Sequence, residues 1–157
     1  MLDTSFCIRL LNQDDPLHSN AVDYFEYFLE NGFIIFVSTI VIAEYAMKDD
    51  PFNLPLNTMR IAPFDFDDAK KAGEFYNLII SEPVNRTVTN RVAIKDDCKI
   101  VSQIANRNIT HYITKDRKSF KELIQPVTQA GLLNVEFIDL SVSLAEFKNE
   151  LPFTSDK

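Results

Sequence analysis

Residues 33–37, Phe-Ile-Ile-Phe-Val, form a continuous apolar run that is as long as a β-strand. A strand that is apolar on both faces is typical of a parallel sheet covered by helices on each side. Before this run, residues 18–30 show apolar side chains at helical spacing, and a glycine follows where a C-cap belongs. After it, Ser38 or Thr39 is placed to cap a helix that reaches about Lys48. Helix, buried strand and helix in succession indicate an α/β domain.

The rest of the chain continues to alternate between strand-like and helix-like stretches. Further strands are expected at residues 1–4, 59–62, 110–114 and 134–140, further helices at 5–11, 65–81, 96–105 and 118–124, and a polar loop at 83–91. This order predicts a mostly parallel central sheet flanked by helices. We expect a single domain over residues 1–157, in which 121–157 contribute a C-terminal helix, a strand and a tail.

The composition excludes several classes of protein. With 46% hydrophobic and 25% charged residues, the chain has the balance of a globular domain rather than a disordered one. Its two cysteines cannot build a disulfide framework, and neither has a partner at zinc-ligand spacing. The longest apolar run is far shorter than the ~20 residues that span a bilayer, and no signal peptide is visible. We therefore expect a cytoplasmic protein without a membrane partner.

Charge is distributed unevenly along the sequence, whose net charge is −7. Residues 1–69 carry three basic and twelve acidic side chains, whereas residues 70–121 carry eleven basic and five acidic ones. The net acidity argues against a protein that coats nucleic acid nonspecifically. The basic middle segment still provides cations for a local surface that contacts phosphates.

Four acidic residues occupy related places in the expected fold. Asp3 and Asp116 follow strands, Asp97 lies in the first turn of a helix, and Glu44 lies on the helix after the strand at 33–37. Strand ends and helix starts of a parallel sheet point to one edge, where ligands bind. Converging carboxylates repel one another unless they are protonated or neutralised, and all-oxygen ligation selects Mg²⁺ or Mn²⁺. Such metals suit phosphodiester hydrolysis, because one ion activates water and another can stabilise the leaving oxygen.

A purely structural interpretation of these acids stays open on the residues alone. Asp and Glu at helix starts commonly cap the helix or interact with its dipole. The position of Asp97 beside Asp96 does not separate a ligand from a cap. The pattern by itself therefore indicates an α/β domain with a candidate acidic metal site.

Four stretches occur in the order and approximate spacing of PIN domains: Leu2-Asp3-Thr4-Ser5, Val37-Ser38-Thr39-Ile40-Val41-Ile42-Ala43-Glu44, Asp97-Cys98-Lys99-Ile100-Val101 and Ile113-Thr114-Lys115-Asp116-Arg117. On these motifs, over residues 1–120, the chain resembles PIN-domain nucleases of the virulence-associated protein C (VapC) toxin type. The resemblance implies a three-layer, Rossmann-like fold with an acidic pocket. It also implies Mg²⁺- or Mn²⁺-dependent endonuclease action on RNA by the toxin of a type II toxin–antitoxin pair.

The resemblance also implies roles for individual residues. Asp3, Asp97 and Asp116 would hold the main ion. Glu44 would bind through water or help a second ion, and would orient the attacking water. Hydroxyl groups that would hydrogen-bond these carboxylates belong to Ser38, Thr114 and Ser5.

Basic residues around the proposed pocket are candidates for binding RNA phosphates on either side of the scissile bond. They are Lys115, Arg117, Lys118 and Lys99. A solvated helix face that balances the acidic parts of the chain is the alternative interpretation of these charges. The family resemblance further implies a homodimer and a small antitoxin protein that covers the pocket.

Two other functions are compatible with parts of the pattern. Only Met1 and Leu2 precede Asp3, whereas family members usually have several apolar strand residues there. A catalytically inactive PIN-like module, acting as a scaffold in an RNA-associated complex, is therefore the main alternative. A phosphotransfer receiver-like domain also gathers aspartates at strand ends, but Asp14 and Asp15 come too late to be its acidic pair.

Overall fold

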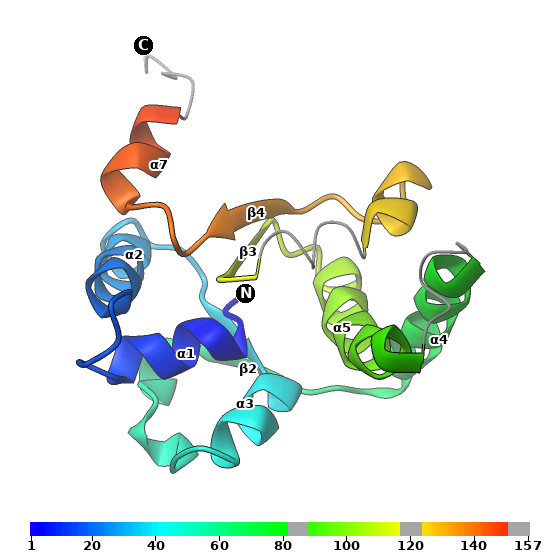
Figure 1. Ribbon diagram of the computed structural model, residues 1–157, viewed down its shortest axis with the longest axis horizontal. Coiled ribbons are helices and arrows are strands. Elements are labelled where there is room, and N and C mark those ends of the chain that lie inside the picture. The colour runs from blue at the N-terminus through cyan, green and yellow to red at the C-terminus, as the bar shows by residue number, and fades with distance from the viewer. Residues whose placement is uncertain (82–87, 117–123, 151–157) are drawn as a thin grey trace.

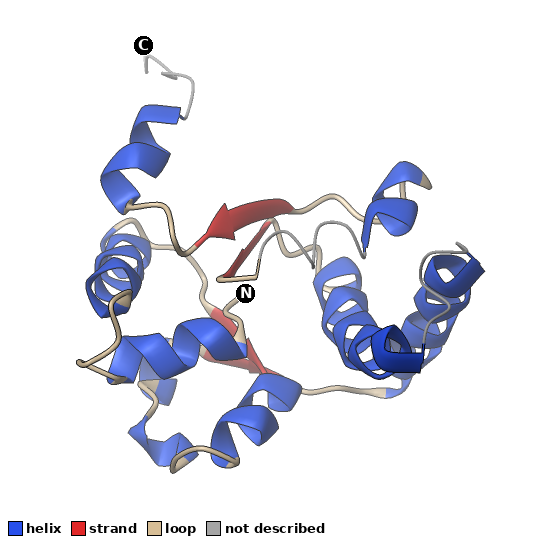
Figure 2. Ribbon diagram, in the orientation of Figure 1, coloured by secondary structure: helices blue, strands red, loops and turns tan. Residues whose placement is uncertain are grey.

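The computed structural model of the chain describes residues 1–81, 88–116 and 124–150. Figure 1 shows a small sheet at the centre, with helices on either side of it. The helices are α1 (Thr4–Leu11), α2 (His18–Glu30), α3 (Thr39–Ala46), α4 (Phe66–Ser81), α5 (Val88–Asn106) and α7 (Leu144–Glu150), and residues 124–129 are also helical. Helices α1 to α3 lie on one side of the strands, and α4 and α5 lie on the other (Figure 2). The expected three-layer α/β arrangement is confirmed.

Within the described residues, four short strands build the sheet: β1 (Phe36–Ser38), β2 (Arg60–Ala62), β3 (His111–Thr114) and β4 (Glu136–Asp139). β1 pairs with β2, and β3 pairs with β4, both in parallel. A single residue, Leu2, joins the two pairs through parallel bridges to Val37 and Ile113. The order across the sheet is therefore β2, β1, Leu2, β3, β4. Because all of these segments run in parallel, their C-terminal ends meet at one edge.

Helix α2 has the bounds that the apolar periodicity predicts. Its buried residues are Ala21, Tyr24, Phe25 and Phe28. Gly32 follows with a positive φ of 69°, the left-handed conformation that terminates many helices. The hydroxyl of Tyr24 donates a hydrogen bond to the carbonyl of Val142 at 3.1 Å, just before α7. The aromatic residues of this helix therefore belong to the core.

The strand expected at residues 33–37 is shorter than the apolar run. Pairing with β2 begins only at Phe36, and the side chains of Phe33 and Ile34 remain 43% and 55% exposed. The strand expected at residues 1–4 is likewise reduced to the bridge made by Leu2. Apolarity therefore identified the strands correctly, but backbone pairing decides where each one starts.

The helix expected to open at Asp96 in fact begins eight residues earlier, at Val88. The polar loop expected at 83–91 is wrong over residues 88–91, while residues 82–87 lie outside the described part of the chain. The adjacent acids at 96 and 97 imitated the acidic first turn of a helix. Asp97 consequently lies in the interior of α5, and the alternative that it caps a helix is excluded.

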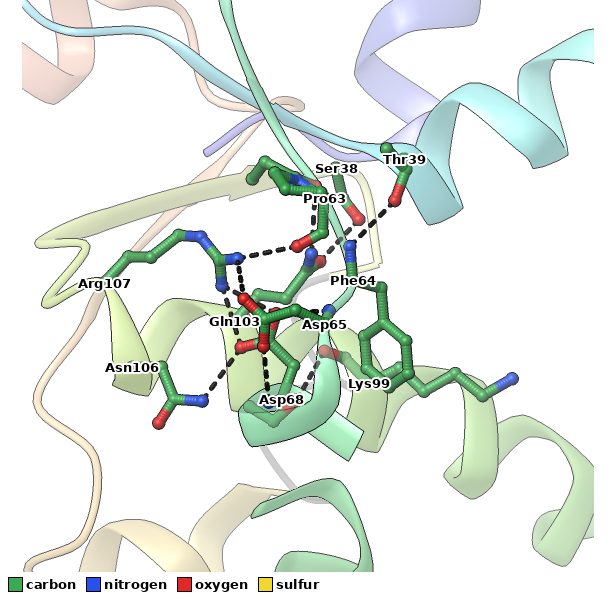
Figure 3. Close-up of polar contacts among 12 residues, drawn as sticks. Ser38, Thr39, Pro63, Phe64, Asp65, Asp68, Lys99, Gln103, Asn106 and Arg107 are labelled. Carbon is green, nitrogen blue, oxygen red and sulfur yellow. Dashed lines mark hydrogen bonds and ion pairs between the residues drawn. The ribbon is translucent and has the colours of Figure 1, made fainter. Parts of the chain in front are cut away.

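A buried polar network joins α4 to α5, as Figure 3 shows. Asp68 is fully buried and accepts hydrogen bonds from Arg107 at 2.8 and 2.9 Å and from Asn106 at 2.9 Å. Burial alone would raise the pKa of Asp68, but the bonds from Arg107 and Asn106 hold it below its usual value. Asp65 and Asp68 each accept the other's backbone N–H, which caps α4. Arg107 also donates to the carbonyl of Pro63 at 2.6 Å, just after β2.

Gln103 connects α5 to the sheet. Its amide donates to the carbonyl of Ala62 at 3.0 Å and accepts a hydrogen bond from the hydroxyl of Ser38 (Figure 3). Asp97 lies one helical turn before the fully buried Val101, so both residues share the inner face of α5. The network therefore fixes the helix that brings Asp97 to the sheet.

Candidate active site

Asp3 directly follows Leu2, the residue at the centre of the sheet. It therefore lies at the edge where the parallel strands end. Its backbone N–H donates to the carbonyl of Ile113 at 3.2 Å, which ties it to β3. Its carboxylate also caps α1 by accepting the backbone N–H of Ser5 at 3.4 Å. The capping role left open by the sequence and a place at the ligand-binding edge thus coexist in one residue.

Three hydroxyl groups hold the carboxylate of Asp3. Ser5 and Thr114 donate to its Oδ2 at 2.6 and 2.9 Å, and Tyr112 donates to its Oδ1 at 3.0 Å. The hydroxyl oxygen of Thr114 in turn accepts the backbone N–H of Asp116 at 3.1 Å. Although only Leu2 represents the first strand, the side chain of Asp3 is therefore firmly oriented, and the turn that carries Asp116 is linked to it.

Glu44 reaches the site from α3, where its side chain is half-buried. Its carboxylate accepts a hydrogen bond from the hydroxyl of Thr4, the first residue of α1. Thr4 thus donates to Glu44, while its neighbour Ser5 donates to Asp3. The start of α1 orients two of the four acids at once.

The charges of the other three acids, Asp3, Glu44 and Asp116, all act on Asp97. Burial, together with the charges of Asp3, Glu44, Asp96 and Asp116, raises its pKa to about 7. Within the described residues, no hydrogen bond or ion pair reaches the carboxylate of Asp97. A half-buried acid thus stands in a strongly negative field, and no residue of the described ranges donates a hydrogen bond to it.

The oxygen donors of these four acids fit a hard divalent cation in chemical type. In the ion pairs of the described residues, no Lys, Arg or His neutralises Asp3, Glu44 or Asp97. However, no three His, Cys, Asp or Glu side chains in residues 1–81, 88–116 and 124–150 converge closely enough to hold a metal ion. Like charges repel, and a cation would draw them together. The donor chemistry therefore fits Mg²⁺ or Mn²⁺, and a complete shell requires side-chain movement or water ligands.

Ser38 differs from the expectation that it hydrogen-bonds a carboxylate. Its fully buried hydroxyl donates to Gln103 and accepts the backbone N–H of Ile40 at 3.0 Å, which caps α3. The last residue of β1 faces α5 at the level of Gln103, and the side chain follows that direction. Ser38 thus supports the helix that carries Asp97 rather than touching an acid.

The expected RNA-binding residues have different surroundings. Lys99 forms an ion pair with Asp96 at 2.7 Å, one turn along α5. Lys115 is exposed next to the turn at the end of β3. Arg117 and Lys118 lie outside the described residues. Of these four cations, Lys115 is the one that the structure places in solvent beside the acidic edge.

Two contact residues were not identified from the sequence, namely Thr4 and Tyr112. Thr4 stands between Asp3 and Ser5, so its position inside the motif was an available signal. Tyr112 precedes Thr114 by two residues, and alternate residues of a strand share one face. That period of two would have placed the phenol beside Asp3. Burial and the nearby carboxylates raise the pKa of Tyr112 well above its usual value, so its hydroxyl keeps its proton.

No family model matches the sequence, and no curated protein is similar enough to match. The chain is similar to one in "Crystal structure of VapBC2 from Rickettsia felis bound to a DNA fragment from their promoter", with a TM-score of 0.61 and 20% identity. The fold is PIN-like. The match covers 88% of this chain and 98% of that one, so the shared fold extends over most of both chains.

None of the helices within the described residues combines the length and the apolar character needed to cross a bilayer.

Proposed function

We propose that the chain is an Mg²⁺- or Mn²⁺-dependent endoribonuclease and the toxin of a type II toxin–antitoxin pair. The observation that carries this proposal is the state of Asp97. This acid lies half-buried among Asp3, Glu44 and Asp116, with no donor from the described residues. Burying an uncompensated acid destabilises a fold, so its presence favours a functional role over a structural one.

The four acids have distinct tasks in this proposal. When bound, Mg²⁺ or Mn²⁺ supplies an activated water and positive charge for the leaving oxygen. Asp3, Asp97 and Asp116 hold the ion, and Glu44, kept in place by Thr4, orients the attacking water. The carboxylate of Asp3 is already fixed by hydrogen bonds, so it needs little reorganisation before the reaction.

RNA as the substrate is supported by the family resemblance and by the charge beside the acids. Lys115 is exposed next to Asp116, where its ammonium group can contact a phosphate adjoining the scissile bond. Arg117 and Lys118 follow in the sequence and extend the basic segment. We propose that this segment orients the RNA backbone rather than reading its bases.

A protein partner is supported by the structural comparison. The similar chain was solved within VapBC2, bound to DNA from the promoter. We propose that the present chain likewise pairs with a small antitoxin and forms a homodimer. Size-exclusion chromatography with light scattering, with and without the product of a neighbouring small gene, tests both assemblies.

Cleavage of RNA by purified variants tests the catalytic assignment. Asp97→Asn and Asp116→Asn should each abolish Mn²⁺-dependent cleavage while circular dichroism shows an intact fold. Asp23→Asn, an exposed acid on α2, is the matched control and should cut like the wild type. Wild-type cleavage by both site variants would refute the proposal. A wild type that binds no Mn²⁺ at millimolar concentration would instead favour the inactive scaffold.

A further inference from the structure

The two oxygens of the Asp3 carboxylate have unequal hydrogen-bond environments. Oδ2 accepts the hydroxyls of Ser5 and Thr114 at 2.6 and 2.9 Å, together with the backbone N–H of Ser5 at 3.4 Å. Oδ1 accepts one bond, from Tyr112 at 3.0 Å. Among the described residues, hydrogen-bond donors thus fill the sites on Oδ2 and leave one site open on Oδ1.

This asymmetry matters because an ionised carboxylate has about four lone-pair sites, two on each oxygen. The two short bonds to Oδ2 occupy both of its sites. One site on Oδ1 is taken by the phenol of Tyr112, and its second site has no donor among the described residues. A cation that approaches Asp3 therefore finds its free electron pair on Oδ1.

The phenol that shares Oδ1 is rigidly held. Tyr112 lies in β3, is 2% exposed, and packs its ring edge-to-face against Phe137 with centroids 6.1 Å apart. Its strand position is fixed by pairing opposite Phe137 of β4. A hydroxyl on such a rigid support sets the direction of the remaining lone pair on Oδ1.

We propose that Tyr112 is a positioning residue, which orients Asp3 so that Oδ1 alone binds the divalent cation. This inference rests on the proposed function and specifies it further. Thr114 and Ser5 keep Oδ2 out of the coordination shell, and Tyr112 aims Oδ1 into it. Asp3 is then a monodentate ligand, and the hydroxyl of Tyr112 contacts the ligand rather than the ion or the RNA.

Binding of Mn²⁺ to purified variants tests this role without relying on catalysis. Tyr112→Phe removes only the hydroxyl and should weaken Mn²⁺ binding about 10-fold, the usual effect of losing a partner of a metal ligand. Tyr24→Phe is the matched control, because Tyr24 is also buried and its hydroxyl donates to the carbonyl of Val142 and not to a proposed metal ligand. Free Mn²⁺ is measured by electron paramagnetic resonance, and thermal unfolding of both variants is compared.

Each outcome distinguishes the inference from the function on which it rests. Weaker Mn²⁺ binding by Tyr112→Phe, with Tyr24→Phe like the wild type, supports the positioning role. Equal Mn²⁺ affinity of folded Tyr112→Phe and wild type would overturn it while leaving the metal site intact. A wild type that binds no Mn²⁺ overturns the proposed function itself. A crystal of the wild type soaked in Mn²⁺ decides the matter independently, since ligation through Oδ2 or through both oxygens contradicts the inference.

Discussion

Asp3 and Thr114 are separated by 111 positions in the sequence, yet a 2.9 Å hydrogen bond joins the hydroxyl of Thr114 to Oδ2 of Asp3. The same hydroxyl accepts the backbone N–H of Asp116. One side chain therefore connects two of the proposed metal ligands, which come from different strand ends. Their relative position is set before any substrate arrives.

Removing the hydroxyl of Thr114 should reduce cleavage more strongly than it reduces the stability of the fold. Thr114→Val keeps the shape but removes the donor to Asp3 and the acceptor for Asp116, so we expect cleavage to fall 10- to 100-fold. The unsatisfied buried groups should lower the free energy of unfolding by about 1–3 kcal/mol. Thr58→Val, at an exposed hydroxyl that donates to Pro55, is the control. Unchanged cleavage by Thr114→Val would show that the link is dispensable.

Burial of Asp97, together with the charges of the neighbouring acids, should make the metal-free protein sensitive to pH. The pKa of this acid is raised to about 7 in the folded state, so the folded protein holds a proton that the unfolded chain releases. The free energy of unfolding should therefore fall as pH rises from about 4 to 7. Asp97→Asn removes this loss, and in EDTA at pH 8 it should be more stable than the wild type by about 1–3 kcal/mol, allowing for partial solvent screening.

Adding Mn²⁺ should make the wild type more stable than Asp97→Asn. The ion stabilises a wild type that binds it and leaves Asp97→Asn nearly unchanged. Thermal unfolding at pH 5 and pH 8, with EDTA or with Mn²⁺, provides the four measurements. A variant less stable than the wild type in EDTA at pH 8 would contradict the repulsion described here.

The network around Asp68 should dominate the acid sensitivity of the fold. Because the pKa of Asp68 is lowered by its partners, its contribution is present at neutral pH and is lost as pH falls below about 4. Asp68→Asn should cost about 2–4 kcal/mol at pH 7, and less at pH 3. Asp67→Asn, the exposed neighbour in the same helical turn, is the control in urea unfolding. Similar free energies of unfolding of the two variants at pH 7 would show that the contacts between Asp68 and Arg107 do not stabilise the fold.

The chemical groups at the ends of the RNA products show whether water or the ribose 2′-hydroxyl attacks the phosphodiester bond. We expect products with 5′-phosphate and 3′-hydroxyl ends, because a water molecule is the nucleophile in the proposed reaction. A substrate with 2′-deoxyribose at the cleaved position should therefore be cut at a similar rate. Mass spectrometry of the fragments makes the measurement, and a 2′,3′-cyclic phosphate would rule out this mechanism.

Much of the fold could be predicted because the strongest local patterns agree with the packing. The apolar spacing of residues 18–30 predicts the bounds of α2 correctly, and the apolar run at 33–37 predicts where β1 lies. Alternation of strands and helices then led to the parallel sheet, and from the sheet to the edge at which Asp3 and Asp116 follow Leu2 and β3. That last step needed only topology, since ends of parallel strands meet wherever the exact boundaries fall.

What could not be predicted depended on tertiary contacts. Nothing local distinguishes the acids at 96 and 97 from a helix start, and only the structure shows that α5 begins at Val88. Ser38 has the same residue type as a carboxylate partner, but its direction is decided by packing against Gln103. Tyr112 resembles an ordinary core residue of its strand, and only the period of two that it shares with Thr114 indicates its place beside Asp3.

The single-residue bridge made by Leu2 has a consequence for protein synthesis. Residue 2 cannot complete its pairing until Ile113 has left the ribosome, and the orientation of Asp3 depends on that pairing. At 5–20 residues per second, roughly 5–20 s of translation separate these two events. For most of its elongation, a nascent chain therefore lacks the hydrogen bond that ties Asp3 to Ile113, so the proposed active site can form only late in synthesis.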